Sequence, residues 1–205
     1  MRKFIQKAMI MPRNLGGGGE VASAIVSRTI TEYADNNITS VGKYAFRDCS
    51  ALTTVDFPLV TSIDSNAFYD CAKLTTVNIP QLTSIGSNAF YNCVKLTTVD
   101  FPLLTSIGNY AFRSCSVMNA IILRSQTMVA IYNENTFSNC YHLLGTVDST
   151  YNPTGAKDGY IYVPSALVES YKTDYYWSNF ATQFRALEDY TVDGTTTGAL
   201  DESKI

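Results

Sequence analysis

The chain has 205 residues, a length that suits one ordinary domain. Hydrophobic residues make up 46% of it and charged residues 16%, a balance that excludes an intrinsically disordered chain and provides for a sizeable core. The net charge of -3 is spread along the sequence without a basic run, so we expect neither a nucleic-acid partner nor binding to an anionic lipid surface.

Residues 1–19 combine a basic leader with a run of glycine. Gln6 and Lys7 interrupt the apolar residues of the leader, so we expect no export signal. No stretch of the chain reaches the roughly 20 apolar residues of a membrane-spanning helix, so we expect no membrane insertion. The glycines at 16–19 favour a flexible linker, and the alternative is an arm that becomes ordered against an assembly partner. Residues 20–37 are expected to form an N-terminal cap.

A 22-residue repeat runs from residue 38 to residue 140. Each copy holds a block of the form T-S-V/I-G/D, then two variable residues, then A-F-x-x-C. Four copies of this block begin at Thr39, Thr61, Thr83 and Thr105. A fifth, degenerate copy ends at Cys140, 25 residues after Cys115, which indicates a local insertion. Internal repetition at such a period predicts a solenoid of stacked units.

The second half of each repeat predicts a strand. In the first copy Val55 and Phe57 alternate with Thr54 and Asp56, the period-2 pattern of a strand with one face on the core. A proline ends each predicted strand, where it removes no hydrogen bond from the middle of the sheet. The three predicted strands are Leu52–Pro58, Leu74–Pro80 and Leu96–Pro102.

The block after each strand predicts a turn that leads into the core. Positions 42, 64, 86 and 108 hold Gly, Asp, Gly and Gly, a set that predicts a positive φ angle. A short helical turn is expected to follow and to direct the Ala, Phe and Cys of the block inward. Phe68 and Phe90 are therefore predicted core residues.

The combined pattern L-x-x-V-x-F-P, T-S-I-G and A-F-x-x-C resembles the BspA-type bacterial leucine-rich repeat. The resemblance covers residues 38 to 140 and implies an α/β repeat fold, a curved right-handed solenoid. Members of this family occur in bacterial surface proteins, in adhesins and in proteins of phages, where they act as recognition or presentation scaffolds. The chain is most similar to the short members seen in gut bacteria and their prophages.

Residues 141–190 predict a C-terminal cap, because an open solenoid end would expose its core and a strand edge. Gly159–Pro164 predicts a strand, and Ser165 is placed to cap a helix over residues 166–172. A second helix is expected from Ser178, because three apolar residues recur at helical spacing after it. These three residues are Phe180, Phe184 and Leu187.

Residues 191–205 are rich in Thr, Gly and Asp. Their composition predicts a mobile tail or a strand that pairs with a partner on assembly.

The five cysteines are expected to be buried, reduced thiols. Four of them occupy one position of the repeat, close enough in principle for disulfides between neighbouring units, but stacked parallel side chains rarely meet the S–S torsion. Neither paired CxxC nor Cys/His spacing occurs, so we expect no metal site. Free cysteine is among the most buried residue types.

The outward positions of the predicted strands form two columns of short polar side chains. This surface is the favoured binding site, for the hydroxyls of a glycan or for a protein. A solvated sheet face without a ligand is the alternative. A cation between the aspartates is not expected, because their mutual repulsion in water is small. The six residues of this surface are Thr54, Asp56, Thr76, Asn78, Thr98 and Asp100.

Aromatic residues form a weaker candidate site in the cap. Tyr175, Tyr176 and Trp177 are adjacent, and such residues are enriched in interfaces. The alternative is that they are ordinary cap residues, which bury the aromatic ring and leave the hydroxyl or indole N–H group in contact with solvent. Further tyrosines lie near the turns of the repeats, namely Tyr44, Tyr69, Tyr91 and Tyr110.

The sequence predicts no catalytic residues and no cofactor. His142 is the one histidine, and no nucleophile motif, carboxylate pair or phosphate loop accompanies it. We therefore expect a recognition or adhesion module for a protein or glycan ligand. The alternative is a structural part of a phage tail or another assembly, attached through the leader or the tail. The family resemblance implies a cell-surface, extracellular or virion-associated location.

Overall fold

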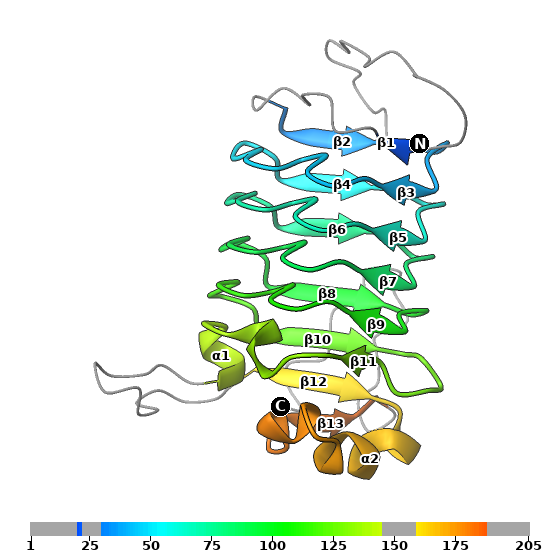
Figure 1. Ribbon diagram of the computed structural model, residues 1–205, viewed down its shortest axis with the longest axis vertical. Helices are drawn as coiled ribbons and strands as arrows, with labels where there is room; N and C mark the ends of the chain where they lie inside the picture. Colours follow the sequence, from blue (N-terminus) through cyan, green and yellow to red (C-terminus); the bar gives the residue numbers. More distant parts are fainter. Residues whose placement is uncertain (1–19, 22–29, 145–158, 188–205) are drawn as a thin grey trace.

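Each repeat forms one rung of a solenoid with two short strands (Figure 1). The computed structural model describes residues 20–21, 30–144 and 159–187. All strand pairs in this part are parallel. The predicted leader and tail lie outside the described residues.

One strand of each rung joins a six-stranded sheet, which we call the serine sheet. Its outward position is serine in four consecutive strands, and the following residue is a buried Val or Ile. The strands, in order of pairing, are β1 (Glu20–Val21), β3 (Ser40–Val41), β5 (Ser62–Ile63), β7 (Ser84–Ile85), β9 (Ser106–Ile107) and β11 (Ala130–Ile131).

The other strand of each rung joins one of two sheets, which we call the threonine sheets. The first contains β2 (Glu32–Ala34), β4 (Thr54–Asp56) and β6 (Thr76–Asn78). The second contains β8 (Thr98–Phe101), β10 (Ala120–Leu123), β12 (Tyr160–Val163) and β13 (Phe184–Ala186). In the pairs β2–β4, β4–β6 and β8–β10, equivalent residues of neighbouring repeats pair at an offset of 22, as Thr54 does with Thr76. The repeat period predicted from the sequence is confirmed.

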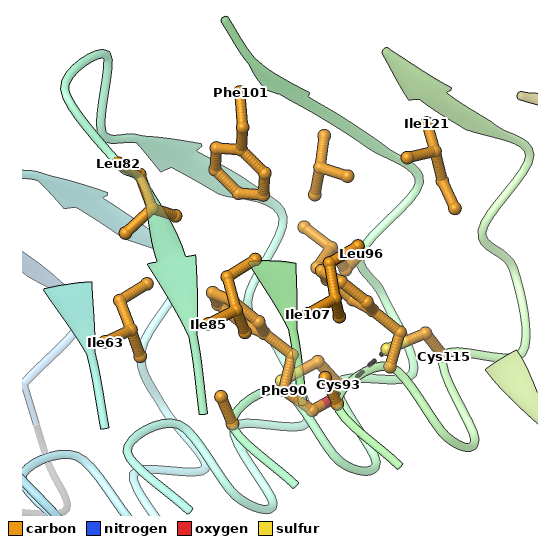
Figure 2. Packing of buried hydrophobic residues seen from close by; sticks show 14 of the residues in the cluster. Ile63, Leu82, Ile85, Phe90, Cys93, Leu96, Phe101, Ile107, Cys115 and Ile121 are labelled. Atoms are coloured by element: carbon orange, nitrogen blue, oxygen red, sulfur yellow. Dashed lines mark hydrogen bonds between the residues drawn. The ribbon is translucent and has the colours of Figure 1, made fainter. Parts of the chain in front are cut away.

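The core lies between the serine sheet and the threonine sheets, where Figure 2 shows Ile63, Ile85 and Ile107 in one row. Five phenylalanine rings stack along the solenoid, with neighbouring centroids 5.0 to 5.6 Å apart and ring planes within 7°. They are Phe46, Phe68, Phe90, Phe112 and Phe137, all fully buried. The predicted burial of the Ala, Phe and Cys of each block is therefore confirmed.

The predicted positive φ angle is wrong at positions 64, 86 and 108. Asp64, Gly86 and Gly108 do not adopt it. Glycine fits the column because neighbouring rungs approach closely there: a Cβ on Gly86 would lie 2.5 Å from the backbone nitrogen of Ser65.

Positive φ occurs instead two and six residues further along each of the four regular blocks and once in the fifth, mostly at Asn and Asp, which tolerate it best after glycine. These residues are Tyr44, Asp48, Asn66, Asp70, Asn88, Asn92, Tyr110, Ser114 and Asn139. They interrupt the predicted helical turn in the four regular blocks. Only the fifth block contains a 3-10 helix, η1 (Glu134–Phe137), whose first turn is capped by the side chain of Asn133.

The insertion before Cys140 is split between two places. The β8–β10 pair keeps the offset of 22, whereas Ala130 of β11 pairs with Ser106 of β9 at an offset of 24. The offset between Cys115 and Cys140 is 25. Two extra residues therefore lie between β10 and β11, and one more follows β11.

The C-terminal cap continues the second threonine sheet. The predicted strand is present as β12, which pairs with β10. The predicted helix is present as the 3-10 helix η2 (Ser165–Leu167) followed directly by α2 (Val168–Thr173). Ser165 is the first residue of η2 and does not occupy the N-cap position of either helix. The cap begins with α1 (Tyr141–Leu144).

The predicted second cap helix is wrong. A 3-10 helix, η3 (Trp177–Phe180), is followed by strand β13, in which Phe184 pairs with Ile161 at an offset of 23. The edge of β12 supplies hydrogen bonds at the rung spacing, and this pairing overrides the helical spacing of the apolar residues. In the described part of the chain, no helix is long and apolar enough to cross a bilayer.

Candidate binding surface

The outer face of the threonine sheets carries the predicted binding residues. Val55 and Val99 face the core, whereas the residues on either side of them are partly or fully exposed. Parallel pairing aligns Thr54 with Thr76 and Asp56 with Asn78. The structure therefore brings the first four residues of the predicted site together.

Hydrogen bonds between rungs hold three of these side chains in place. The amide nitrogen of Asn78 donates to a carboxylate oxygen of Asp56 at 2.8 Å. One rung further on, the hydroxyl of Thr98 donates to the side-chain oxygen of Asn119 at 3.4 Å. Thr98 and Asp100 belong to the second threonine sheet, since β6 and β8 are not paired. The polar columns are therefore ordered within each sheet.

Asp100 has a partner that sequence reasoning missed. Arg124 donates three hydrogen bonds of 2.8 to 3.1 Å to the carboxylate of Asp100, two from Nε and one from Nη2. These bonds raise the pKa of Arg124, because they stabilise its charged guanidinium. The sequence does contain a signal for this pair. Ile122 is the counterpart of Asp100 one repeat later, and Arg124 follows Ile122 by two residues, so Arg124 lies on the same face of the sheet as Asp100.

The polar surface ends at β10. Ala120 and Ile122 occupy the outward columns there and are almost fully buried, together with Tyr162 of β12. The sheet thus carries a second, small apolar cluster on its outer side. The polar face lies before this cluster, on β4, β6 and β8, and exposed Glu32 of β2 continues the column of Thr54 at its other end.

Threonines just before the strands connect neighbouring rungs through hydrogen bonds from their hydroxyl groups. The hydroxyl of Thr75 donates to the carbonyl of Thr53 at 3.1 Å, and Thr53 donates in turn to Thr31 at 2.8 Å. A parallel series beside the serine sheet joins Thr105 to Thr83 and Thr83 to Thr61, at 2.9 Å each. These threonines have a structural role, which distinguishes them from the outward threonines of the strands.

All five cysteines are buried and free, in agreement with the prediction. Four thiols donate to the carbonyl of the phenylalanine in the preceding rung, at 3.0 to 3.2 Å, as Cys115 does to Phe90 (Figure 2). Burial raises the pKa of the thiols of Cys71, Cys93, Cys115 and Cys140 well above the ordinary range. The thiols therefore act as small core groups that link rungs.

The cap aromatics separate into core and surface residues. Trp177 is 1% exposed, and its indole nitrogen donates to the carbonyl of Val129 at 2.7 Å. The Tyr171 hydroxyl accepts from the backbone nitrogen of Val129, also at 2.7 Å. Tyr176 packs partly against the core, whereas Tyr175 is 82% exposed. Trp177 is thus unavailable to a ligand, which corrects its assignment to a binding site.

A shallow hollow of about 440 Å³ lies on the outer side of the serine sheet. It is lined by the serines and neighbouring residues of β3, β5 and β7, with Asp64 beside them. Sequence reasoning did not single out this column, because a repeated serine resembles an ordinary solvated position.

His142 lies in α1 and is partly exposed, and its backbone carbonyl accepts from the nitrogen of Gly159 at 2.9 Å. It does not line the hollow over the serine sheet. Within the described ranges, no three His, Cys, Asp or Glu side chains gather in a way that could hold a metal ion.

The sequence model of the BspA type Leucine rich repeat region matches residues 28–147, with six copies of the repeat. The chain belongs to this family. The match covers more than half of the chain and includes the rungs that carry the polar surface. A search of curated proteins found no match.

Solved structures of bacterial leucine-rich-repeat proteins are similar to this chain, and the first two below share its fold. The T. pallidum leucine rich repeat protein TpLRR is 27% identical, with a TM-score of 0.51 over 56% of this chain and 56% of its own. A leucine-rich repeat protein from Bacteroides ovatus is 23% identical, with a TM-score of 0.54 over 82% of this chain and 39% of its own. A leucine rich cell surface protein from Faecalibacterium prausnitzii is 23% identical, with a TM-score of 0.46 over 80% and 46%. The chain thus spans about half or less of the length of each.

Proposed function

We propose that this BspA-type repeat protein is a non-enzymatic recognition module that binds a protein or glycan through the outer face of the threonine sheets. The observation that carries the proposal is the alignment of polar side chains over consecutive rungs, fixed by the hydrogen bond between Asn78 and Asp56. Ordered polar groups lose less conformational freedom on binding than mobile ones.

The chemistry of the surface suits a ligand that both donates and accepts hydrogen bonds. Among the described residues, no partner occupies the hydroxyl groups of Thr54 and Thr76. Asp56 keeps acceptor capacity beyond its bond to Asn78, because a carboxylate has about four lone-pair sites. Sugar hydroxyls and the backbone of an extended peptide offer the matching groups.

The proposal includes display at the cell surface, outside the cell or on a virion, as the family resemblance implies. It requires no cofactor, metal ion or catalytic residue. A structural role in a phage tail or another assembly is the competing function, and it predicts that the polar face has no soluble ligand of its own.

The test is a screen of the purified chain on glycan and host-protein arrays, with two matched double variants. Thr76→Ala with Asn78→Ala removes polar groups from β6, while Ser62→Ala with Ser84→Ala removes the same number from the serine sheet. We expect the first variant to lose binding and the second to keep it, with unchanged circular dichroism in both. Loss only in the serine variant would move the site to the serine sheet, and no binding by the wild-type chain would favour the assembly role.

A further inference from the structure

The loops that lead from the serine sheet to the threonine sheets form a third surface, on the left in Figure 1. We call it the turn edge and define it as residues 43–51, 65–73, 87–95 and 109–117. It carries five basic side chains, namely Lys43, Arg47, Lys73, Lys95 and Arg113, and two acidic ones, Asp48 and Asp70. The turn edge is therefore positive on a chain whose net charge is -3.

Four stacked side chains run along the centre of this edge. The equivalent positions of the four repeats are Arg47, Tyr69, Tyr91 and Arg113. The two tyrosine rings stack with centroids 4.7 Å apart and planes within 3°. The Arg47 guanidinium lies 5.0 Å from the centroid of Tyr69, and that of Arg113 lies 5.9 Å from the centroid of Tyr91. Each ring thus has a second ring on one side and a cation on the other.

The flanking tyrosines extend this arrangement. Tyr44 lies under Lys43 and Arg47, with the cations 5.1 and 5.4 Å from its ring centroid. At the other end of the edge, the Arg113 guanidinium is also 5.5 Å from the centroid of Tyr110. The arginines are therefore held between aromatic rings. Such contacts position a guanidinium without neutralising its charge.

The positive charge of the edge is poorly paired within the described residues. Lys73, Lys95 and Arg113 have no carboxylate within 4.0 Å, and Arg47 approaches Asp48 only to 3.8 Å. By contrast, three hydrogen bonds bind Arg124 to Asp100 on the threonine sheets. Cations that are positioned but unpaired are suited to an anionic partner.

The geometry of the rings narrows the class of partner. Single-stranded nucleic acids bind by stacking bases on free aromatic faces. Here the faces of Tyr69 and Tyr91 are already covered, so the edge offers cationic groups and ring edges instead. Arg47 and Arg113 are three rungs apart, about 14 Å at the spacing of paired strands. Same-face side chains of an extended peptide repeat at about 7 Å, so acidic residues four positions apart would match both arginines.

We propose that the turn edge is a second interaction surface, separate from the threonine sheets, which docks an extended acidic segment of a partner protein. Lys73 and Lys95 lie between the arginines along the solenoid and would meet the intervening acidic residues. The ring ladder holds the end cations at a fixed spacing, so that little side-chain freedom is lost on docking.

The test is a fluorescence anisotropy titration of the full chain with a labelled twelve-residue peptide of alternating Glu and Ser, at 50 mM salt. We expect saturable binding that weakens as salt rises. Lys95→Glu should weaken it at least tenfold. Lys172→Glu, which makes the same change of charge at a partly exposed residue of α2 that pairs with Glu169, should weaken it less than twofold.

Two further variants separate a specific site from general attraction. Arg47→Lys with Arg113→Lys keeps the charge but replaces the planar groups that contact the rings, and we expect several-fold weaker binding with unchanged circular dichroism. Thr76→Ala with Asn78→Ala should leave peptide binding unchanged, which keeps this proposal distinct from the function of the threonine sheets. Equal losses from Lys95→Glu and Lys172→Glu would overturn the proposal. The absence of peptide binding at 50 mM salt would overturn it too, even if the chain bound other polyanions such as heparin or poly(dT).

Discussion

The phenylalanine stack makes Phe90 the most informative single site for stability. Phe90 is fully buried, and its ring lies 5.2 Å from both Phe68 and Phe112. Truncation of a buried phenylalanine to alanine costs about 3–5 kcal/mol. Phe90→Ala removes two ring pairs, each worth about 0.5–1.5 kcal/mol beyond buried area, so we expect its cost at the upper end of this range, near 5 kcal/mol.

Chemical denaturation followed by circular dichroism measures this free energy of unfolding, and the fluorescence of the single tryptophan, Trp177, reports the cap separately. Because rungs are coupled to their neighbours, both signals should move to lower denaturant. Tyr175→Ala is the control, since an aromatic side chain that is 82% exposed should change stability by less than about 0.5 kcal/mol. A loss below about 1 kcal/mol for Phe90→Ala would refute the assignment of the stack as the core.

Three further predictions follow from buried or paired groups. Trp177→Phe leaves the Val129 carbonyl without its indole donor and should cost about 1–3 kcal/mol in the same denaturation assay; no loss would show that the bond is dispensable. Burial raises the pKa of the Cys93 thiol, so the folded state holds this proton more tightly than the unfolded state. Stability should therefore fall as pH rises above about 8.5, and the Cys93→Ala variant should show a shallower fall in melts from pH 7 to 10. Asp100→Asn removes the carboxylate charge that pairs with Arg124 and should cost up to about 1 kcal/mol at low salt, a difference that 1 M salt should shrink.

The sequence was a good guide to whatever the repeat period controls. Phe68 and Phe90 were predictable as core residues, because a 22-residue period places every copy in the same environment. The polar columns were predictable for the same reason, since alternation within a strand decides which residues face outward. The family resemblance rests on the same period.

Features that depend on contacts between rungs were not predictable in this way. The glycine at position 86 suggests a positive φ angle, but it is required by the close approach of Ser65 from the preceding rung. Phe184 fits a helical spacing within its own segment, and only the exposed edge of β12 makes it a strand residue. Arg124 lies two residues beyond Ile122, the repeat counterpart of Asp100, so its pairing with Asp100 could be found only by comparing neighbouring rungs and not from either strand alone.

The regular offset between paired strands has a consequence for how such proteins change in length. Thr54 pairs with Thr76 and Ser62 pairs with Ser84, in both cases at an offset of one repeat. A second copy of a unit such as residues 61–82 could therefore form the same pairings with the rungs on either side of it. Gene duplication within the array would therefore lengthen the molecule in steps of about 4.8 Å and leave the caps intact. Two surface groups on opposite sides of the inserted unit would move apart by one rung spacing for each unit added. The backbone pairing therefore determines the distances that can separate such groups.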